Sequence, residues 1–591
     1  MPSGSNPTAA DVVSRFLAHA AARPDAPAVV EDGGALTYGQ LETASATLAS
    51  LLLRQHGMGR DSAPIVAVLL PRGAAAVVAA LGVQRAGAAH LPLEPRDPDD
   101  RLRLITKDAR PACLITDQAG EKLAAGWGLP VVSVDEASVE ASPVELSIPK
   151  PSDWAAVIYT SGTTGTPRGV VVHHEGLGHL VASHVSHFDT GPGDRVGWAS
   201  DMGFDAAMWD VWSTLGAGAT LYVAEDAIRL DSARLITWLE QHEISSIFLV
   251  TPLAAELMLR GDPPVALRAL LTGGDRLWQV PPGRTRSWPV YNAYGPTEGT
   301  VAVTWTGPIA PTNTAPSLGR PLPGVVVHIL DATRTPLAVG EVGEIAFSGP
   351  SVTWGYLRDP RRTAERWIPD PAGHGTRMFL TGDLGLLDAY GELRFVGRAD
   401  EQLKVRGIRI EPAEIVEAAL ALSGVTGAVA VPFGEPTDPA IGLLWTAGAT
   451  DLDEAQLLTH LRSLLAAPVV PKRVRCVAEL PRTTRGKIDH AQASELLAAI
   501  DAVTATVPAT VLADPMERLV AEIFAEILEV ESPGPNDTLF GLGGTSMLAV
   551  RVLARLREHA PTFPLVRLYR QPTVREVAIA LRELGAFSPA D

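Results

Sequence analysis

The chain has only two cysteines, Cys113 and Cys476, among its 591 residues. Two cysteines so far apart in the sequence provide neither a disulfide framework nor a cysteine-based metal cluster. Such scarcity is typical of proteins that fold in a reducing compartment. We therefore expect a cytoplasmic protein.

Basic side chains are in deficit: 49 Lys and Arg stand against 67 Asp and Glu, for a net charge of −18. Nucleic-acid binding needs clustered Lys and Arg, so this balance argues against a nucleic-acid partner. Long apolar runs are also missing, because Pro71 and Arg72 interrupt the best candidate for a membrane span. Residues 1–7 lack the basic start and apolar run of a signal peptide. We expect no membrane partner.

The length exceeds what one hydrophobic core supports, so several domains are expected. Residues 11–22 and 74–86 have helical patterns, whereas residues 28–31, 64–70 and 246–250 read as strands. A second helix is expected to open at residues 36–41, with Thr37 as its cap. Up to about residue 330 strands and helices alternate, which predicts parallel sheets covered by helices.

Later segments have other patterns. Residues 324–330 and 343–348 are short β-rich runs that predict a small antiparallel or barrel-like unit, and residues 391–397 form a further strand. Residues 401–500 indicate a smaller α+β unit. The last segment predicts a helical bundle, with a helix capped by Asp514, a second starting at Ser546 and a third starting at Thr573.

The stretch from Ser161 to Gly169 combines four hydroxyl residues and three glycines, with Arg168 near its end. Glycine lets the backbone approach a ligand closely and turn its N–H groups toward it. Hydroxyl groups add donors and the cation adds charge, so the stretch predicts a phosphate-binding loop. It is not the Walker type, because no Gly-Lys-Ser/Thr follows. A polar loop without a ligand is the alternative from composition alone.

Six short motifs, in this order, resemble those of a nonribosomal peptide synthetase adenylation domain. They are residues 159–170, Asn292 to Glu298, Thr381 to Leu384, Gly397 to Asp400, Lys404 to Gly407 and Gly486 to Asp489. Asp537 to Met547 then resembles the motif of a fused peptidyl carrier protein. The adenylation part is also similar to acyl- and aryl-CoA ligases and luciferases. The resemblance covers residues 12–588.

The resemblance implies a domain organisation. Residues 1–399 would form a large α/β core, with parallel sheets and a small barrel-like unit. Residues 400–500 would form a mobile α+β subdomain that turns about a hinge at Asp400. A linker at 501–513 would lead to an all-α four-helix carrier at 514–591.

The resemblance further implies ATP-dependent activation of an amino acid as aminoacyl-AMP, then transfer to a carrier thiol. Lys487 would bridge the substrate carboxylate and the α-phosphate, Glu298 would hold Mg²⁺, and Arg168 would provide a loop cation. The implied ATP-binding residues are Thr160, Ser161, Gly162, Thr163, Thr164, Gly165, Asn292, Ala293, Tyr294, Asp383 and Arg398.

Asp205 matches the carboxylate that pairs with the substrate's α-ammonium group, and this match favours amino acids over fatty or aryl acids. The remaining residues that match the pocket are Ala206, Trp209, Phe248, Leu271, Gly273, Ala293, Val301 and Ala302. None of these is charged, which favours an aliphatic, leucine-like side chain. Valine, isoleucine or a modified aliphatic amino acid remain open, because one methylene changes binding by only about 1–3 kcal/mol.

Ser546 matches the serine that carries 4′-phosphopantetheine, which implies a phosphopantetheinyl transferase as a partner. Condensation, transfer or tailoring enzymes would act downstream, and a need for a small MbtH-like helper protein stays open. The sequence departs from the family at Arg168, where Lys is usual, and at His490, where Arg is common. An acyl-acid ligase and a catalytically inactive scaffold that presents a carrier are therefore kept as alternatives.

Overall fold

The structure of the chain is a computed structural model. It describes residues 11–56, 64–134, 146, 148–160, 167–283, 285, 287–371, 373, 376–398, 403–405, 408–433, 440–448, 452–481, 488, 490–504, 514–528, 530, 533–535, 537–539, 542, 546–560, 563, 568 and 573–584. Contacts divide the chain into two compact units. One comprises residues 1–225, 236–418 and 461–469, and the other comprises residues 226–235, 419–460 and 470–591.

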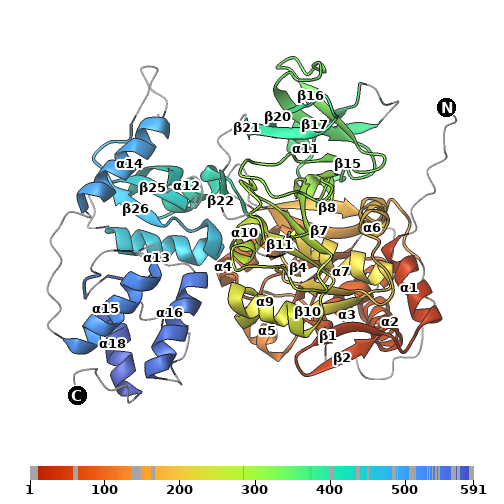
Figure 1. Cartoon of the computed structure of the whole chain (residues 1–591), viewed down its shortest axis with the longest axis horizontal. Helices are drawn as coiled ribbons and strands as arrows, with labels where there is room; N and C mark the ends of the chain where they lie inside the picture. The colour runs from red at the N-terminus through yellow and green to blue at the C-terminus, as the bar shows by residue number, and fades with distance from the viewer. Residues whose placement is uncertain are drawn as a thin grey trace. The chain divides into compact units, whose positions relative to one another are not determined.

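The first unit contains a nine-stranded sheet (Figure 1). The strand order is β15 (Arg320–Pro321), β14 (Thr304–Trp305), β13 (Val290–Tyr294), β12 (Ala269–Gly273), β11 (Ser246–Val250), β9 (Arg195–Trp198), β10 (Thr220–Val223), β1 (Pro27–Glu31) and β2 (Gly34–Thr37). Strands β13 to β1 pair in parallel, whereas both edges of the sheet are antiparallel. The prediction of a parallel sheet is therefore confirmed for its centre.

A second, seven-stranded sheet lies in the same unit. Its order is β18 (Gly355–Tyr356), β8 (Arg168–His173), β7 (Trp154–Thr160), β4 (Ala89–Leu93), β3 (Ile65–Leu69), β5 (Cys113–Thr116) and β6 (Val131–Ser133). The strands from β7 to β6 pair in parallel, and β8 pairs antiparallel with β7 and β18. Their near-continuous burial is typical of parallel strands covered on both faces.

Helices lie between and around these two sheets (Figure 1). Helix α3 (Ala74–Arg85) contacts β3 and β4 of one sheet and β1 of the other. Helix α6 (His174–Phe188) packs on β7 and β8, and on α7 (Asp205–Ala217), which contacts β9, β10 and β11. Helix α7 is almost entirely buried, which explains why its sequence is apolar on all sides. Gly218 ends it in the left-handed conformation, with φ of 75°.

The other helices of the first unit flank this arrangement. They are α1 (Val12–Ala22), α2 (Tyr38–His56), α4 (Asp99–Ala109), α5 (Gln118–Leu123), α10 (Thr251–Met258) and α11 (Pro360–Arg366). Asp11 caps α1 by accepting a hydrogen bond from the Ser14 N–H at 3.0 Å, as expected for a helix over residues 11–22. Among the helices of the described residues, none has the length and apolarity that crossing a bilayer requires.

The small β-rich unit expected after residue 324 is confirmed. A five-stranded antiparallel sheet contains β16 (Val326–Leu330), β17 (Gly343–Ser348), β20 (Arg377–Leu387), β19 (Trp367–Pro369) and β21 (Leu393–Arg398). This sheet carries Asp383 and Arg398 at neighbouring positions of β20 and β21.

The prediction that a helix opens at residues 36–41 is wrong in its first two residues. Gly34–Thr37 forms strand β2, which pairs antiparallel with β1 across a tight turn in which Gly33 has φ of 103°. Helix α2 begins at Tyr38. Thr37 nevertheless caps it, because the Gln40 N–H donates to the Thr37 hydroxyl at 3.2 Å and the Gln40 side chain accepts from the Thr37 N–H.

The second unit contains a three-stranded sheet and a set of helices. The sheet is formed by β24 (Val425–Phe433), β25 (Ala440–Ala447) and β26 (Arg473–Cys476), and α14 (His490–Thr504) packs on β24 and β25. The remaining short elements of the chain are α8 (Asp226–Arg229), α9 (Ser232–Gln241), β22 (Leu403–Val405), β23 (Ile408–Ile410), α12 (Pro412–Leu420) and α13 (Glu454–Leu464).

The C-terminal helical bundle is confirmed as a separate core. Helix α15 (Pro515–Leu528) packs on α16 (Ser546–His559) and α18 (Val574–Glu583), around buried residues that include Phe524 and Leu556. Helix α18 starts after Thr573, as predicted, and Thr573 and Glu576 form a capping box there. Asp514 caps α15, but Glu517 accepts a hydrogen bond from Arg575 at 2.8 Å instead of completing a second box.

Candidate functional site

The predicted phosphate loop joins two antiparallel strands. Thr160, the last residue of β7, is the register partner of Arg168, the first residue of β8. The connecting residues, including Ser161, Gly162, Thr163, Thr164 and Gly165, lie outside the described residues. The structure thus places Thr160 and Arg168 at the two ends of this connection.

Arg168 lies against an aromatic ring. Its guanidinium carbon is 5.6 Å from the ring centroid of Tyr356, whose strand β18 pairs with β8. Burial lowers the pKa of the Arg168 guanidinium, and Arg362 lowers it further, while the group stays a cation at neutral pH. A planar guanidinium stacks on an aromatic face in a way that the compact lysine ammonium does not. Arginine in place of the usual lysine at position 168 therefore makes a stacking contact with Tyr356 that lysine would not make.

Tyr356 also connects this cation to the predicted metal-binding carboxylate. Its hydroxyl donates to Oε1 of Glu298 at 2.8 Å. Glu298 lies in the short 3-10 helix η3 (Thr297–Gly299) after β13 and is fully buried. Because the tyrosine has one hydroxyl hydrogen, this bond fixes one carboxylate oxygen and leaves further acceptor positions on the carboxylate.

Asp205, the first residue of α7, is connected to Glu298 through the neighbouring residue Thr297. The hydroxyl of Thr297, which precedes Glu298, donates to Oδ2 of Asp205 at 2.7 Å. Burial raises the pKa of the Asp205 carboxyl to about 6; the nearby Glu298 adds to this rise and Thr297 opposes it. A buried carboxylate that has a hydroxyl partner is stabilised further when a cation binds beside it.

Asp210, on the same helix, shows the contrast. Burial raises the pKa of its carboxyl to about 8, and the Ser200 hydroxyl lies 2.7 Å from its Oδ2. This carboxyl is protonated at neutral pH and packs as a neutral group. Helix α7 therefore carries two buried carboxyl groups: Asp205, which could pair with a cation, and Asp210, which is part of the packed interior.

Three parallel strands bring four of the predicted pocket residues to one face. Phe248 on β11 is the register partner of Leu271 on β12, and Gly273 is the partner of Ala293 on β13. Alternate residues of a strand point to the same side, so these four residues share a face. A Cβ atom on Gly273 would lie 2.6 Å from the Ala293 carbonyl oxygen, which explains why glycine is needed there.

Helix α7 covers this face with Trp209, whose ring centroid is 5.5 Å from that of Phe248. Trp209 is 2% exposed. Ala206 is also buried, and it lies on the same helix one turn closer to Asp205. Trp209 of α7 therefore packs on the strand face that carries Phe248, and Ala206 and Asp205 precede it on the same helix.

Val301 and Ala302 come from a strained loop after η3. Thr300 and Val301 have φ of 52° and 73°, which is unusual for a β-branched residue. The Thr300 hydroxyl donates to the Ser351 carbonyl at 2.9 Å, and Val303 N–H donates to the Tyr294 carbonyl at 2.8 Å. These bonds hold the strained backbone in place. Strain of this kind is common at ligand-binding sites.

Two of the predicted ATP-binding residues, Asn292 and Tyr294, lie on the other face of β13. Asn292 and Tyr294 alternate with Ala293, so they point away from the pocket face. The Tyr294 hydroxyl donates to Oδ2 of Asp383 at 2.6 Å, and Arg398 donates to Oδ1. The Asn292 amide donates to the Ser317 carbonyl at 3.3 Å. Each oxygen of Asp383 retains a lone pair for a further donor, such as a ribose hydroxyl.

The donor set near Glu298 fits magnesium. Among the described residues no group of three or more His, Cys, Asp and Glu side chains could hold a metal ion by itself. Magnesium is usually bound by one or two carboxylates together with substrate phosphates. A single buried carboxylate, linked through Tyr356 to Arg168 at the end of the predicted phosphate loop, meets that description.

Several predicted residues fall outside the description. Asp400 and Lys487 lie outside the described residues, and Ser546 begins helix α16 while its side chain is not described. Sequence reasoning in turn missed Tyr356, the hydroxyl role of Thr297, and His184, which contacts Trp209. The motif Asn292 to Glu298 contains Thr297, but nothing in the sequence connects Tyr356 to Glu298 across 58 positions.

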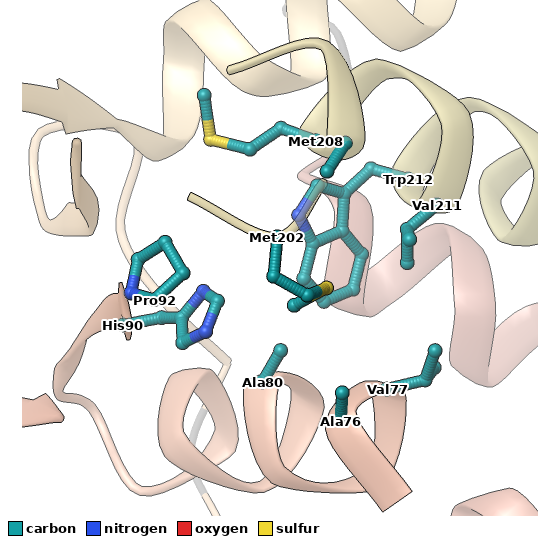
Figure 2. A pocket seen from close by; sticks show the side chains of 10 residues that line it. Ala76, Val77, Ala80, His90, Pro92, Met202, Met208, Val211 and Trp212 are labelled. Carbon is teal, nitrogen blue, oxygen red and sulfur yellow. The ribbon is translucent and has the colours of Figure 1, made fainter. Parts of the chain in front are cut away.

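A small pocket lies beside α7, lined in part by residues of that helix (Figure 2). Its lining consists of Ala76, Val77, Ala80, His90, Pro92, Met202, Ala207, Met208, Val211 and Trp212. His90 is buried, and this burial lowers the pKa of its imidazole to about 3. Its Nε2 has no hydrogen-bond partner among the described residues. This pocket shares no residue with the predicted amino-acid pocket.

Comparison with protein families finds two matches. Residues 16–357 match the AMP-binding enzyme family, and residues 518–581 match a phosphopantetheine attachment site. The predicted core and carrier each contain one of them.

Two curated proteins with similar sequences differ greatly from each other in length. A linear gramicidin synthase of Brevibacillus parabrevis is 35% identical over 579 residues, which cover 95% of this chain and 11% of that protein. Novobiocin biosynthesis protein H of Streptomyces niveus is 35% identical over 583 residues, which cover 94% of this chain and 93% of that protein. The chain thus spans about a tenth of the gramicidin synthase and nearly all of the novobiocin protein.

A solved structure has the same overall architecture. Holo-PA1221, described as a nonribosomal peptide synthetase protein with adenylation and carrier domains, superposes with a TM-score of 0.79 at 25% identity. The match covers 98% of this chain and 97% of that chain. It confirms the expected fold class of a large α/β core, an α+β region and a helical carrier portion.

Proposed function

The chain belongs to the AMP-binding enzyme family, with the adenylation and carrier organisation of nonribosomal peptide synthetases, and on this premise we propose a function for it. It activates an aliphatic, leucine-like amino acid with ATP and loads the aminoacyl group onto its own carrier. The two family matches support both halves of this reaction within one chain.

Asp205 is the observation that carries the amino-acid assignment. Its carboxyl lies at the polar end of an otherwise uncharged pocket, bonded to Thr297 at 2.7 Å. An α-ammonium group would supply the cation that a buried carboxylate favours, and the two charges would compensate each other's desolvation. A fatty or aryl acid has no such group and would leave the carboxylate uncompensated, so the acyl-acid ligase alternative is disfavoured.

The aromatic and aliphatic walls support the side-chain class. Trp209 and Phe248 close one end of the pocket, while Gly273, Ala293 and Ala302 leave width. A charged side chain would find no partner among the pocket residues Ala206, Leu271 and Val301. A pocket that is limited in length but wide in its middle would accept a branched aliphatic side chain of medium size.

The nucleotide is held by residues on the other side of β13. Tyr294 and Asn292 contact the base, Asp383 accepts from the ribose hydroxyls, and Arg398 orients Asp383 through their ion pair. The loop from Thr160 to Arg168 wraps the terminal phosphates. Glu298 would hold Mg²⁺, and the metal would supply positive charge beside the phosphate oxygens.

Chemistry proceeds by attack of the substrate carboxylate oxygen on the α-phosphorus, with loss of pyrophosphate. Lys487 stabilises the negative charge that develops between these groups. Asp400 serves as the hinge about which the smaller subdomain turns before the second half-reaction. Ser546 would hold 4′-phosphopantetheine, whose thiol would accept the aminoacyl group in exchange for its proton, with AMP as the leaving group.

These assignments imply partners. A phosphopantetheinyl transferase modifies Ser546, and condensation, transfer or tailoring enzymes receive the aminoacyl group. The length of the gramicidin synthase relative, of which this chain matches 11%, is consistent with further modules acting on the tethered product.

ATP–pyrophosphate exchange with a panel of amino acids and matched acids that lack the α-amino group tests the proposal. We expect exchange with leucine or a related aliphatic amino acid and none with 4-methylpentanoic acid, its des-amino counterpart. Exchange with the des-amino acid at an equal rate would support the acyl-acid ligase instead. Absence of exchange with every acid would support the inactive scaffold.

A further inference from the structure

The indole of Trp209 is held by a hydrogen bond at the back of the pocket. Its Nε1–H donates to Nδ1 of His184 at 3.0 Å, and the two rings meet edge to face at 90°. His184 lies on α6 and is 3% exposed. The indole N–H has one hydrogen to donate, so this contact uses it completely.

The bond to Trp209 fixes the tautomer of His184. Because Nδ1 accepts from the indole, a neutral imidazole must carry its hydrogen on Nε2. Nε2 lies 3.0 Å from the hydroxyl oxygen of Thr190, which is 4% exposed and can accept that hydrogen. Burial lowers the pKa of His184 to about 3, so the ring stays neutral at physiological pH. Both ring nitrogens are satisfied in one arrangement.

Aromatic rings enclose the indole on its other sides. Trp305 stacks on Trp209 with centroids 6.1 Å apart and planes 18° apart, and Phe248 lies at 5.5 Å. Phe188 packs on both His184 and Trp305. Packing of this kind has little directional preference, so it does not by itself select which edge of the indole faces His184. The hydrogen bond to His184 is directional and selects one orientation of the ring.

We propose that His184, held by Thr190, is a positioning residue that orients Trp209 as the end wall of the amino-acid pocket and thereby sets the preference for side-chain size. The proposal rests on the proposed function and deepens it. Losing the bond leaves a buried indole N–H without a partner, so the ring tilts or water enters. Either change alters the space for a terminal methyl group, which is the feature that separates aliphatic amino acids.

The side-chain geometry offers matched substitutions. In His184→Asn the amide oxygen takes the place of Nδ1 and can still accept from the indole. In His184→Gln the amide takes the place of Nε2, and in His184→Phe no acceptor remains. Thr190→Val removes only the partner of Nε2. His242→Phe is the control, because the His242 ring packs on Tyr222 and Trp238, which are not residues of the predicted pocket.

The experiment measures kcat/KM in ATP–pyrophosphate exchange for alanine, valine, isoleucine, leucine and phenylalanine with the full-length protein. We expect His184→Phe and His184→Gln to change the ratio between the best and second-best amino acid by about ten-fold, through the KM for the amino acid and not for ATP. Thr190→Val should shift the ratio in the same direction by less. His184→Asn and His242→Phe should keep the wild-type ratio.

A second arm repeats His184→Phe in a Trp209→Phe background, where no indole N–H remains. There the histidine substitution should no longer change the ratio, which separates orientation of the indole from general loosening. An unchanged ratio in His184→Phe, His184→Gln and Thr190→Val, with an active wild type, would overturn the inference. An equal shift in the Trp209→Phe background would overturn it as well. A wild type that activates no amino acid would instead overturn the proposed function.

Discussion

Asp205 and Trp209 are four residues apart on α7, yet they belong to opposite surroundings. Asp205 is bonded to Thr297, next to Glu298 and Tyr356, in a chain of hydroxyl and carboxylate groups. Trp209 lies among Phe248, Trp305 and His184, in a cluster of rings. The same helix therefore presents a carboxylate at one end of the proposed pocket and an aromatic ring at the other.

This difference separates two kinds of functional effect. Removing one partner of a buried ion pair costs several kcal/mol, because the remaining charge is left buried without compensation. Apolar walls distinguish substrates by only about 1–3 kcal/mol per methylene. Changes at the polar end should therefore reduce activation of every amino acid, whereas changes at the aromatic end should change their order.

The largest effect is expected for Lys487→Ala, which removes the cation that we propose for the polar end. ATP–pyrophosphate exchange should fall by roughly 10²- to 10³-fold, the range for losing one group that stabilises developing charge. Transfer of the aminoacyl group from preformed adenylate to the carrier should stay largely intact. Exchange near the wild-type rate would remove Lys487 from the polar end.

Asp205→Asn is expected to reduce kcat/KM for amino acids by about 10²- to 10³-fold, because the substrate ammonium loses its buried counter-charge. The loss should be similar for valine, leucine and isoleucine, and the KM for ATP should change little. Steady-state exchange at varied amino acid and ATP measures both. A change in the order of amino acids without a general loss would break the division between the two ends.

Tyr356→Phe removes one hydroxyl from the polar end and leaves the ring beneath Arg168 in place. We expect exchange to fall by roughly ten-fold, since hydrogen bonds to charged groups contribute about 1.5–3 kcal/mol. The Mg²⁺ concentration for half-maximal ATP binding, followed by calorimetry, should also rise. Tyr222→Phe, a tyrosine on β10 that contacts His242 and Arg195, is the control. Unchanged Mg²⁺ dependence would show that the bond to Glu298 does not position the carboxylate.

The smallest effect concerns stability rather than activity. Burial lowers the pKa of His90 and of His184 to about 3 in the folded protein, whereas an unfolded histidine takes up a proton near pH 6.5. The unfolded state thus binds more protons below pH 6.5, and the free energy of unfolding falls as the pH drops. Each histidine contributes up to about 1.4 kcal/mol per pH unit.

Thermal unfolding between pH 7 and pH 5 measures this slope. His184→Asn and His90→Leu should each flatten it, and the double variant should flatten it further. Equal slopes in the wild type and both variants would mean that neither imidazole resists protonation in the fold.

Sequence patterns predicted the strands and helices whose apolar residues recur with the local period of a strand or a helix. Residues 246–250 and 343–348 form strands with the predicted bounds, and the helix over residues 11–22 begins one residue later, after its cap. The strand at Gly34–Thr37 escaped prediction because it depends on pairing with β1, and not on its own composition.

Family motifs predicted the carboxylates and the pocket residues, but not the groups that contact them in the structure. The bond from Tyr356 to Glu298 joins residues 58 positions apart, and the bond from Trp209 to His184 joins residues 25 positions apart. Neither partner has a local pattern, because each bond depends on how α6, α7 and β18 pack together. Such contacts follow from the tertiary structure alone.

Intact mass of the phosphopantetheinylated protein, after incubation with ATP, Mg²⁺ and single amino acids, tests the central claim most directly. We predict one added aminoacyl group with an aliphatic amino acid, and no phosphopantetheine arm and no aminoacyl group in Ser546→Ala. An arm that stays unloaded with every amino acid, or that loads with des-amino acids instead, would contradict this claim.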